Sequence, residues 1–203
     1  MFNTKEKNER ALGTKLFLKA HRCNSSKCVM TKRPHRPGLH GKDRHSSSEY
    51  GQQLNEKQKL RLSYGLREAY MRKIFANAAK NPGVTNNLII QFLERRLDNA
   101  VFRLGLAPSR SVGRQLVSHG HILVNNAKVK APSYLVKTKD KINIRSQSKD
   151  MALFKDLPER LKKYETPVWL RIDKDKLEGE VVSLPNDSET LFDINKVVDY
   201  YSK

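Results

Sequence analysis

Residues 93–145 contain two amphipathic helical patterns and a hairpin pattern in direct succession, and this succession constrains the fold more than any other stretch. A helix over residues 93–104 would place its leucines and small apolar residues on one face. Ser109 is a candidate N-cap of a second helix, which Gly120 would end. Residues 122–129 then predict a strand, a tight turn at two asparagines and a return strand. The stretch therefore predicts one compact α+β module.

Basic and amide side chains recur beside the apolar face of both predicted helices. Arg96, Asn99 and Arg103 follow helical spacing on the first helix, and Arg110 and Arg114 lie one turn apart on the second. Guanidinium forks match the geometry of phosphate oxygens. We therefore expect both helices to present these side chains outward, to structured RNA.

The charge of the chain supports a polyanionic partner and is unevenly distributed. The 40 Lys and Arg against 21 Asp and Glu leave a net charge of +19. Residues 1–80 contain 19 basic and 6 acidic side chains, residues 81–149 contain 12 and 3, and residues 150–203 contain 9 and 12. Nucleic acid should face the first two thirds. The acidic last third is better suited to cover the core or to contact a basic protein.

Several segments resemble one family. Residues 93–99 (LERRLDN) and 109–125 resemble the RNA-binding module of the S-four family of bacterial small-subunit ribosomal proteins. Other RNA-associated proteins share that module, so the flanking segments decide. Residues 32–41 and residues 49–65 are each similar to a further signature of the same family, outside the module.

The expected fold class is α+β. It comprises a mainly helical N-terminal domain and an inserted small RNA-binding module, in which two helices pack on a short, mostly antiparallel sheet. We expect residues 1–48 to form a basic extended arm that orders largely on its partner. Residues 49–92 would form the helical rRNA-binding domain, which residues 186–203 complete, and residues 93–185 would form the module with the strands that follow it. The insertion is what the resemblance implies.

Hydrophobic periodicity predicts the remaining elements. Helices are expected over residues 66–80, over residues 153–164 with an interruption at Pro158, and over residues 193–201. Strands are expected at 132–136, 141–144, 169–172 and 181–184. Lysines and arginine coat most of the helix within residues 49–65, which predicts that it lies against phosphates rather than in a core.

The resemblance implies a structural constituent of the small ribosomal subunit, not an enzyme. Such a protein would bind 16S rRNA directly and early in assembly, and would line the path of incoming mRNA with the third and fifth small-subunit proteins, with an effect on translational accuracy. The alternatives are an RNA-modifying enzyme and a free-standing DNA- or RNA-binding protein. Arg96-Leu97-Asp98 resembles the catalytic tripeptide of pseudouridine synthases, but no stretch is large enough for their catalytic domain.

The side chains expected to bind RNA are basic or polar and lie in the arm, the first helix of the helical domain and the module. They are Lys32, Arg33, Arg36, His40, Lys57, Lys59, Arg61, Arg95, Arg96, Asn99, Arg103, Arg110, Arg114, Gln115, His119, His121 and Lys128.

Two cysteines, Cys23 and Cys28, are candidate zinc ligands, although structural zinc needs four. Some members of the family carry a preceding cysteine pair, and Glu6 and Glu9 stand at those positions here. His21, His35 and His40 are candidate substitutes, and two free thiols without any cofactor are the alternative. No apolar run has the length of a membrane span or of a signal-peptide core, so we expect no membrane partner and a cytoplasmic, ribosome-bound protein, with an organellar origin left open.

Overall fold

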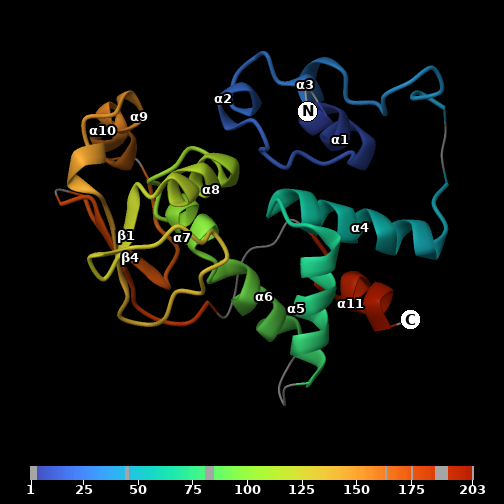
Figure 1. The fold of residues 1–203 in the computed structure, drawn as a ribbon. Coiled ribbons are helices and arrows are strands. Elements are labelled where there is room, and N and C mark those ends of the chain that lie inside the picture. The colour runs from blue at the N-terminus through green and yellow to red at the C-terminus, as the bar shows by residue number, and fades with distance from the viewer. Residues whose placement is uncertain are drawn as a thin grey trace. The chain divides into compact units, whose positions relative to one another are not determined.

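The computed structural model describes residues 4–43, 46–80, 85–162, 164–174, 176–185 and 192–202. The chain forms two compact units, residues 1–89 with 189–203 and residues 90–188 (Figure 1). The second unit is thus inserted into the first. The first is helical and the second combines helices with an antiparallel sheet, so the predicted α+β fold class is confirmed.

Seven helices lie wholly or partly in the first unit as far as it is described. They are α1 (Thr4–Leu12), α2 (Ala20–Cys23), α3 (Val29–Lys32), α4 (Glu49–Ser63), α5 (Glu68–Lys80), α6 (Thr85–Glu94) and α11 (Ile194–Ser202). The boundary between the units falls within α6. Residues 186–191, which we assigned to this unit from the sequence, lie outside the described residues.

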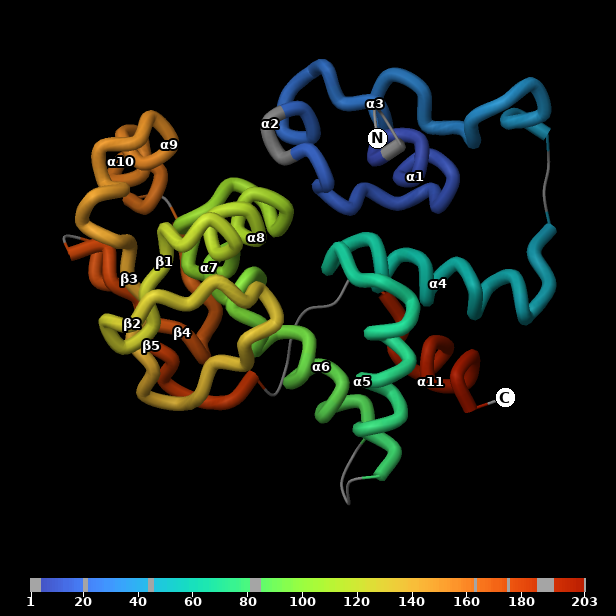
Figure 2. Tube along the Cα trace, viewed as in Figure 1, coloured from blue at the N-terminus to red at the C-terminus, as the bar shows by residue number. Residues whose placement is uncertain are grey.

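The apolar stripe of α5 forms the centre of the helical unit. Met71, Ile74, Phe75 and Ala78 are buried, as helical spacing predicts. The ring of Phe75 packs on the ring of Tyr201 in α11, with 4.4 Å between their centroids. Both Figure 1 and Figure 2 show α11 beside α4 and α5, and α11 makes residue contacts with both helices. The end of the chain therefore completes a core that begins before the inserted unit.

The first part of the arm differs from the extended arm predicted for residues 1–48. Residues 4–32 form three short helices, because a few buried side chains give them a small core of their own. Leu16, Cys23 and Cys28 are 3–4% exposed, and Glu9 is 2% exposed beside them. The segment after α3 lacks regular secondary structure up to residue 43, which agrees with its prolines and glycines.

The inserted unit contains the predicted module and the strands after it. Its elements are α7 (Leu97–Arg103), α8 (Arg110–His119), β1 (Ile122–Val124), β2 (Ala127–Lys128), β3 (Lys141–Ile144), the 3-10 helix η1 (Ser146–Ser148), α9 (Ala152–Lys155), α10 (Leu157–Lys162), β4 (Leu170–Asp173) and β5 (Glu178–Val181).

Local turn and cap signals are confirmed around α8. The Ser109 hydroxyl accepts a hydrogen bond from the Val112 backbone N–H, and Gly120 ends the helix in the left-handed conformation with φ of 74°. Asn125 and Asn126 both have positive φ, as a tight hairpin turn between β1 and β2 requires. The hairpin therefore returns the chain directly after α8.

The single helix predicted over residues 93–104 is wrong, because α6 ends at Glu94 and α7 begins at Leu97. Arg96 adopts an extended conformation at the break and forms an isolated antiparallel bridge with Leu135. The expected strand at 132–136 is reduced to this bridge. Tertiary pairing with a distant segment has thus overridden helical periodicity.

Five strands form one antiparallel sheet in the order β2-β1-β3-β5-β4. The strands predicted at 141–144 and 169–172 correspond to β3 and β4, whereas the last strand, β5, begins and ends three residues earlier than predicted. Figure 1 shows α7 and α8 against the sheet, and leucines and valines of both helices are buried with Ile122 and Ile142 in one core. No helix of the described residues is long and apolar enough to cross a membrane.

Candidate nucleic-acid interface

A buried carboxylate organises the arginines of the module. Glu94, at the end of α6, is fully buried, and its carboxylate accepts hydrogen bonds from Arg103 at 2.9 and 3.0 Å. Asn99 donates to the Glu94 carboxylate and to the Glu94 backbone carbonyl. Arg110 donates to the Asn99 side-chain oxygen at 2.7 Å and lies over the Phe102 ring. We refer to Glu94, Asn99, Arg103 and Arg110 as the Glu94 network.

The prediction that Arg96, Asn99 and Arg103 all point outward is wrong. Arg96 is 3% exposed and pairs through two nitrogens with Asp98, itself 4% exposed. Asn99 is 1% exposed, and the Arg103 side chain is 25% exposed in its pair with Glu94. Helical spacing correctly placed these side chains on one side of α7. That side is not exposed, because α6 and residues 130–136 cover it. The Arg96–Asp98 pair also gives the tripeptide shared with pseudouridine synthases a structural role in this chain.

Four of the side chains predicted to bind RNA lie exposed along α8 and on the hairpin. Arg114, Gln115, His119 and Lys128 are exposed. Gly120 allows Lys128 to lie close to the end of α8, because a Cβ at position 120 would overlap the Lys128 side chain. The hairpin thus holds Lys128 beside the end of the helix that carries His119.

Two further predicted residues, His121 and Arg95, are half-buried and hydrogen-bonded within the chain. The His121 ring hydrogen-bonds the Ser148 hydroxyl at 2.9 Å and lies 6.0 Å from the His119 ring. Arg95 donates to the Val136 carbonyl at 2.9 Å and is half-buried. We define Arg110, Arg114, Gln115, His119 and Lys128 as the α8 face, with Arg110 anchored in the Glu94 network.

The prediction that charge on α4 faces phosphates is wrong for Lys57. This ammonium is buried, lies 3.1 Å from the Glu68 carboxylate and stands over the Tyr200 ring at 4.7 Å. Tyr201 also donates to Glu68. Burial alone would raise the pKa of Glu68, but the hydrogen bonds from Tyr201 and Lys57 hold this pKa below its ordinary value. Lys57 therefore joins α4 to α5 and α11.

The other two basic residues predicted on α4 are half-buried and paired within the helix. Lys59 contacts the Glu56 carboxylate at 2.6 Å, and Arg61 donates to the Gln58 side chain at 3.0 Å. Each of these side chains has its partner one turn away on α4. The helix therefore offers less free positive charge to a phosphate than its sequence suggests.

All four residues predicted in the arm, Lys32, Arg33, Arg36 and His40, are exposed. The residue that positions them could not be identified from the sequence. Arg10 in α1 donates hydrogen bonds to the backbone carbonyls of Arg33, His35 and Arg36 at 3.0–3.3 Å. His40 pairs with Asp43 at 3.0 Å. The Arg10 fork thus fixes the basic segment by its backbone and leaves its side chains exposed.

The two cysteines lie in the small core of the arm, next to Glu9. One Glu9 oxygen accepts backbone hydrogen bonds from Leu16 and Leu18 at 3.1 Å each, and both oxygens are 3.9 Å from the Cys23 sulfur. Burial raises the pKa of Cys23, and the nearby Glu9 charge adds to this effect. For Cys28, burial is outweighed by hydrogen bonds from Met30 and Thr31, which lower its pKa.

The described residues do not fit a four-ligand zinc site. Glu6 faces Arg22 at 2.9 Å and Lys19 at 3.6 Å, and Glu9 is committed to backbone donors. No group of three or more metal-ligating side chains gathers in the part of the chain that is described. The side chain of His21, a candidate substitute ligand, lies outside that part.

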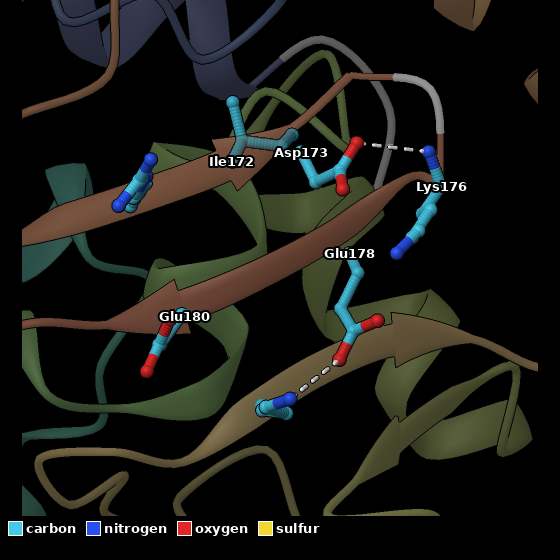
Figure 3. Close-up of a pocket in the computed structure, with 7 residues that line it drawn as sticks. Ile172, Asp173, Lys176, Glu178 and Glu180 are labelled. Atoms are coloured by element: carbon cyan, nitrogen blue, oxygen red, sulfur yellow. Dashed lines mark hydrogen bonds and ion pairs between the residues drawn. The ribbon is translucent and has the colours of Figure 1, made fainter.

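A hollow of mixed charge lies on the outer side of β3, β4 and β5, away from the α8 face. Its volume is about 310 Å³, and Asp173, Glu178 and Glu180 line it together with Lys141, Arg171 and Lys176. Figure 3 shows Glu178 among the residues that line this hollow. The Glu178 carboxylate lies 3.9 Å from the Lys141 ammonium. Opposite charges balance here, so this hollow has no preference for a polyanion.

The fold and the α8 face define a class of RNA-associated protein. The protein-family model of the S4 domain matches residues 95–142, which include α7, α8 and the hairpin. A second family model, described as the ribosomal protein S4/S9 N-terminal domain, matches residues 2–94. Both matches agree with the resemblance seen in the sequence.

Full-length relatives specify the family. The chain is 47% identical over 193 residues to small ribosomal subunit protein uS4A of Alkaliphilus oremlandii, covering 94% of this chain and 93% of the relative. It is also 47% identical to the uS4 proteins of Koribacter versatilis over 194 residues (94% and 93%) and of Dehalococcoides mccartyi over 196 residues (96% and 94%). The chain belongs to the uS4 family of small-subunit ribosomal proteins, structural and non-enzymatic components of the ribosome.

Proposed function

We propose that this chain binds 16S rRNA directly, as an early assembly protein that organises a multi-helix junction in the 5′ region of the RNA. The observation that carries the proposal is the α8 face, a group of basic and amide side chains that are exposed apart from the half-buried Arg110 and lie within the residues that the S4 domain model matches. Positive charge dominates the first two thirds of the chain and gives the same preference for phosphates.

The α8 face favours recognition of backbone and shape over recognition of bases. Its side chains are arginine, lysine, glutamine and histidine, which donate to phosphate and ribose oxygens. The edges of bases in the major groove of an RNA helix are too deep for such side chains to reach. We therefore infer that the face lies against the backbone of a folded junction.

The C-terminal strands support a second part of the proposal, a contact with protein neighbours. The last third of the chain is net acidic, and the hollow of Figure 3 presents three carboxylates among three basic groups. Such a surface suits a polar protein contact better than phosphates. Together with the resemblance to the family, it favours placement beside the third and fifth small-subunit proteins, along the path of incoming mRNA, with an effect on translational accuracy.

We propose that the chain performs this role on cytoplasmic ribosomes without a bound metal. Glu9 already joins α1 to the segment around Leu16 and to Cys23, which is the kind of cross-link that a structural zinc ion would provide. Metal analysis of the purified chain tests this part. One equivalent of zinc that survives dialysis would contradict it.

Binding and sedimentation together test the main proposal. The full chain should bind a transcribed 5′-domain fragment of 16S rRNA with an affinity that falls steeply between low and physiological salt. In cell extracts it should sediment with small subunits and their precursors in a sucrose gradient. Affinity that hardly changes with salt, or a chain found in the free fractions, would contradict the proposal.

A further inference from the structure

The strand β4 lies at one edge of the sheet and has a neighbouring strand on one side only. The sheet order β2-β1-β3-β5-β4 places β5 beside it, and Figure 3 shows Ile172 and Asp173 on this outer strand. Its other side is available to a further strand. Edges of this kind are templates for pairing with another chain, and proteins usually protect them.

The direction of the backbone groups on β4 follows from the hydrogen bonds at its start. The Trp169 carbonyl accepts a hydrogen bond from the Val182 N–H at 2.9 Å, so Trp169 points toward the β5 side. The Leu170 N–H points the other way and donates to the Pro167 carbonyl at 2.9 Å. Because backbone groups alternate in direction along an antiparallel strand, Ile172 turns its N–H and C=O to the outer edge. Among the described residues, no backbone group bonds Ile172 on that side.

The side chains on either side of Ile172 carry opposite charges. Arg171 and Asp173 are exposed, whereas Ile172 is half-buried against the core on the inner face of the sheet. Arg171 lies opposite Glu180 of β5, and Asp173 lies opposite Glu178. The second of these is a pair of like charges, which weakens a sheet. The edge therefore presents a cation and an anion separated by one apolar residue, and the anion lacks a cation opposite it.

This order of residues is complementary to itself. If two copies of β4 pair antiparallel about a twofold axis, Ile172 can face Ile172 of the second copy and exchange both backbone hydrogen bonds with it. Arg171 then lies opposite Asp173 of the second copy, and Asp173 lies opposite Arg171. These flanking positions are non-hydrogen-bonded pairs, in which side chains approach most closely. A shift by two residues would instead oppose two arginines or two aspartates, so the charges favour a single register.

We propose that the β4 edge is a self-association surface, through which two copies of this chain form a dimer with one continuous antiparallel sheet. Arg171 of the second copy supplies the cation that Asp173 lacks beside Glu178. The strand β2, which carries Lys128 of the α8 face, stands at the opposite end of the sheet order. The pairing therefore leaves the α8 face of each copy available.

Sedimentation equilibrium of the full chain, free of RNA, measures the association. The net charge of +19 on each copy opposes contact, so the experiment is run at about 0.3 M salt, which screens that repulsion. A short edge forms a small interface, so the protein concentration is varied from about 5 to about 500 µM. The weight-average mass should rise from 23.4 kDa toward twice that value across this range. A mass that stays at 23.4 kDa throughout overturns the inference.

Charge reversal tests the register of the pairing. R171D and D173R each oppose like charges at both flanking positions, so each should raise the dimer dissociation constant about 10-fold or more. An equimolar mixture of the two variants should restore the dimer, because every flanking position then faces the opposite charge. R171D/D173R in one chain should self-associate like the parent for the same reason. If neither the mixture nor the double variant recovers the dimer, the proposed register is wrong and the inference falls.

Matched controls separate the edge from a general effect of charge. K149D and D150R make the same changes of charge at two exposed positions of the same unit and should leave the dimer unchanged. The fluorescence of Trp169, which is buried beside β4, verifies that the sheet is intact in every variant. Dimers that respond equally to the control substitutions and to R171D and D173R would overturn the inference.

A strand of another small-subunit protein is the competing occupant of the β4 edge. Small subunits reconstituted with R171D should contain the same proteins as subunits reconstituted with the K149D control. If R171D subunits lost a neighbouring protein and the free parent stayed monomeric at every concentration, the edge would belong to that protein, and self-association would be overturned.

Discussion

A carboxylate that leaves water on folding needs both charge compensation and hydrogen-bond donors. The Glu94 carboxylate obtains both from Arg103 and Asn99. Asn99 in turn accepts a hydrogen bond from Arg110 and so restrains the position of that guanidinium. Removal of Glu94 would leave Arg103 without its carboxylate and Asn99 without one of its acceptors. The Glu94 network therefore preorganises the guanidinium of Arg110, one turn before Arg114 on α8.

The first prediction concerns these two arginines. Replacement of both Arg110 and Arg114 with alanine should remove about two phosphate contacts and reduce the salt slope of rRNA binding by about two units. The fold should survive, because the lost Arg110–Asn99 hydrogen bond and Phe102 contact contribute about 1 kcal/mol each. Filter binding and circular dichroism on the same sample measure both effects. The Arg110→Lys, Arg114→Lys variant is the charge-matched control, and a double alanine variant that binds as tightly as the parent at physiological salt contradicts the prediction.

The second prediction concerns the pH dependence of the helical unit. The pKa of Glu68 is lower in the folded chain than its ordinary value of 4.5, so its ion pair and hydrogen bonds stabilise the fold above that pH. This stabilisation disappears as the pH falls through the lower, folded pKa. Urea unfolding followed by circular dichroism should therefore show a loss between about pH 6 and about pH 3 that Glu68→Gln reduces. Glu165→Gln, at an exposed position, is the control. If both variants follow the same pH profile, Glu68 does not carry the effect.

At the scale of elements, the contact between α7 and α8 depends on Gly113. A Cβ at this position would lie 2.7 Å from the Asp98 carbonyl oxygen, a backbone atom that cannot turn away. Two effects oppose each other in Gly113→Ala. Alanine favours the helix by about 1 kcal/mol, whereas forced separation of packed helices costs about 1–3 kcal/mol. The close approach of the helices should decide the outcome.

The third prediction is therefore that Gly113→Ala destabilises the inserted unit by about 1–2 kcal/mol. The single tryptophan, Trp169, is buried in the core of that unit, and its fluorescence reports the unfolding directly. Gly51→Ala in α4 is the matched control, because its Cβ would meet nothing closer than 3.4 Å and should leave stability unchanged or raised. A Gly113→Ala variant as stable as the parent would show that α8 can shift without cost.

Elements that depend on local chemistry could be predicted from the sequence. The Ser109 cap, the Gly120 stop and the paired asparagines of the hairpin each contain their own structural signal, and each is confirmed. The break before α7 could not be predicted, because it arises from the pairing of Arg96 with Leu135. Hydrophobic periodicity describes one helix at a time and carries no information about pairing with a distant segment of the chain.

The same limit applies to the candidate interface. Exposure was predicted for four basic residues of the arm, where few apolar side chains are available to cover them, and all four are exposed. Exposure was predicted wrongly for Lys57, Arg96 and Asn99, because each contacts a buried or half-buried acidic residue from another position in the chain. A basic residue beside an apolar stripe is therefore ambiguous until the position of the acidic residues is known.

At the scale of the whole molecule, the insertion gives two units with separate cores. The inserted unit buries its own apolar cluster, which includes residues from α7, α8, all of the central strands and Trp169. The helical unit is closed by α11, which the chain reaches only after the insertion. Completion of the helical unit consequently requires both ends of the sequence, whereas the inserted unit is continuous.

The last prediction follows from this difference. A chain of residues 90–188 should fold alone, because its core lies within those residues and a domain of this size usually unfolds cooperatively. Urea unfolding followed by Trp169 fluorescence should give one sigmoidal transition close to that of the full chain. The isolated unit should still bind the 16S rRNA fragment through the α8 face, but with a smaller salt slope, because the exposed basic residues of the arm are missing. A chain of residues 1–80 alone is the contrasting control and should lack a cooperative transition, since α11 is absent from it. Exposed tryptophan emission from the isolated unit in the absence of urea would contradict the prediction, as would a salt slope equal to that of the full chain.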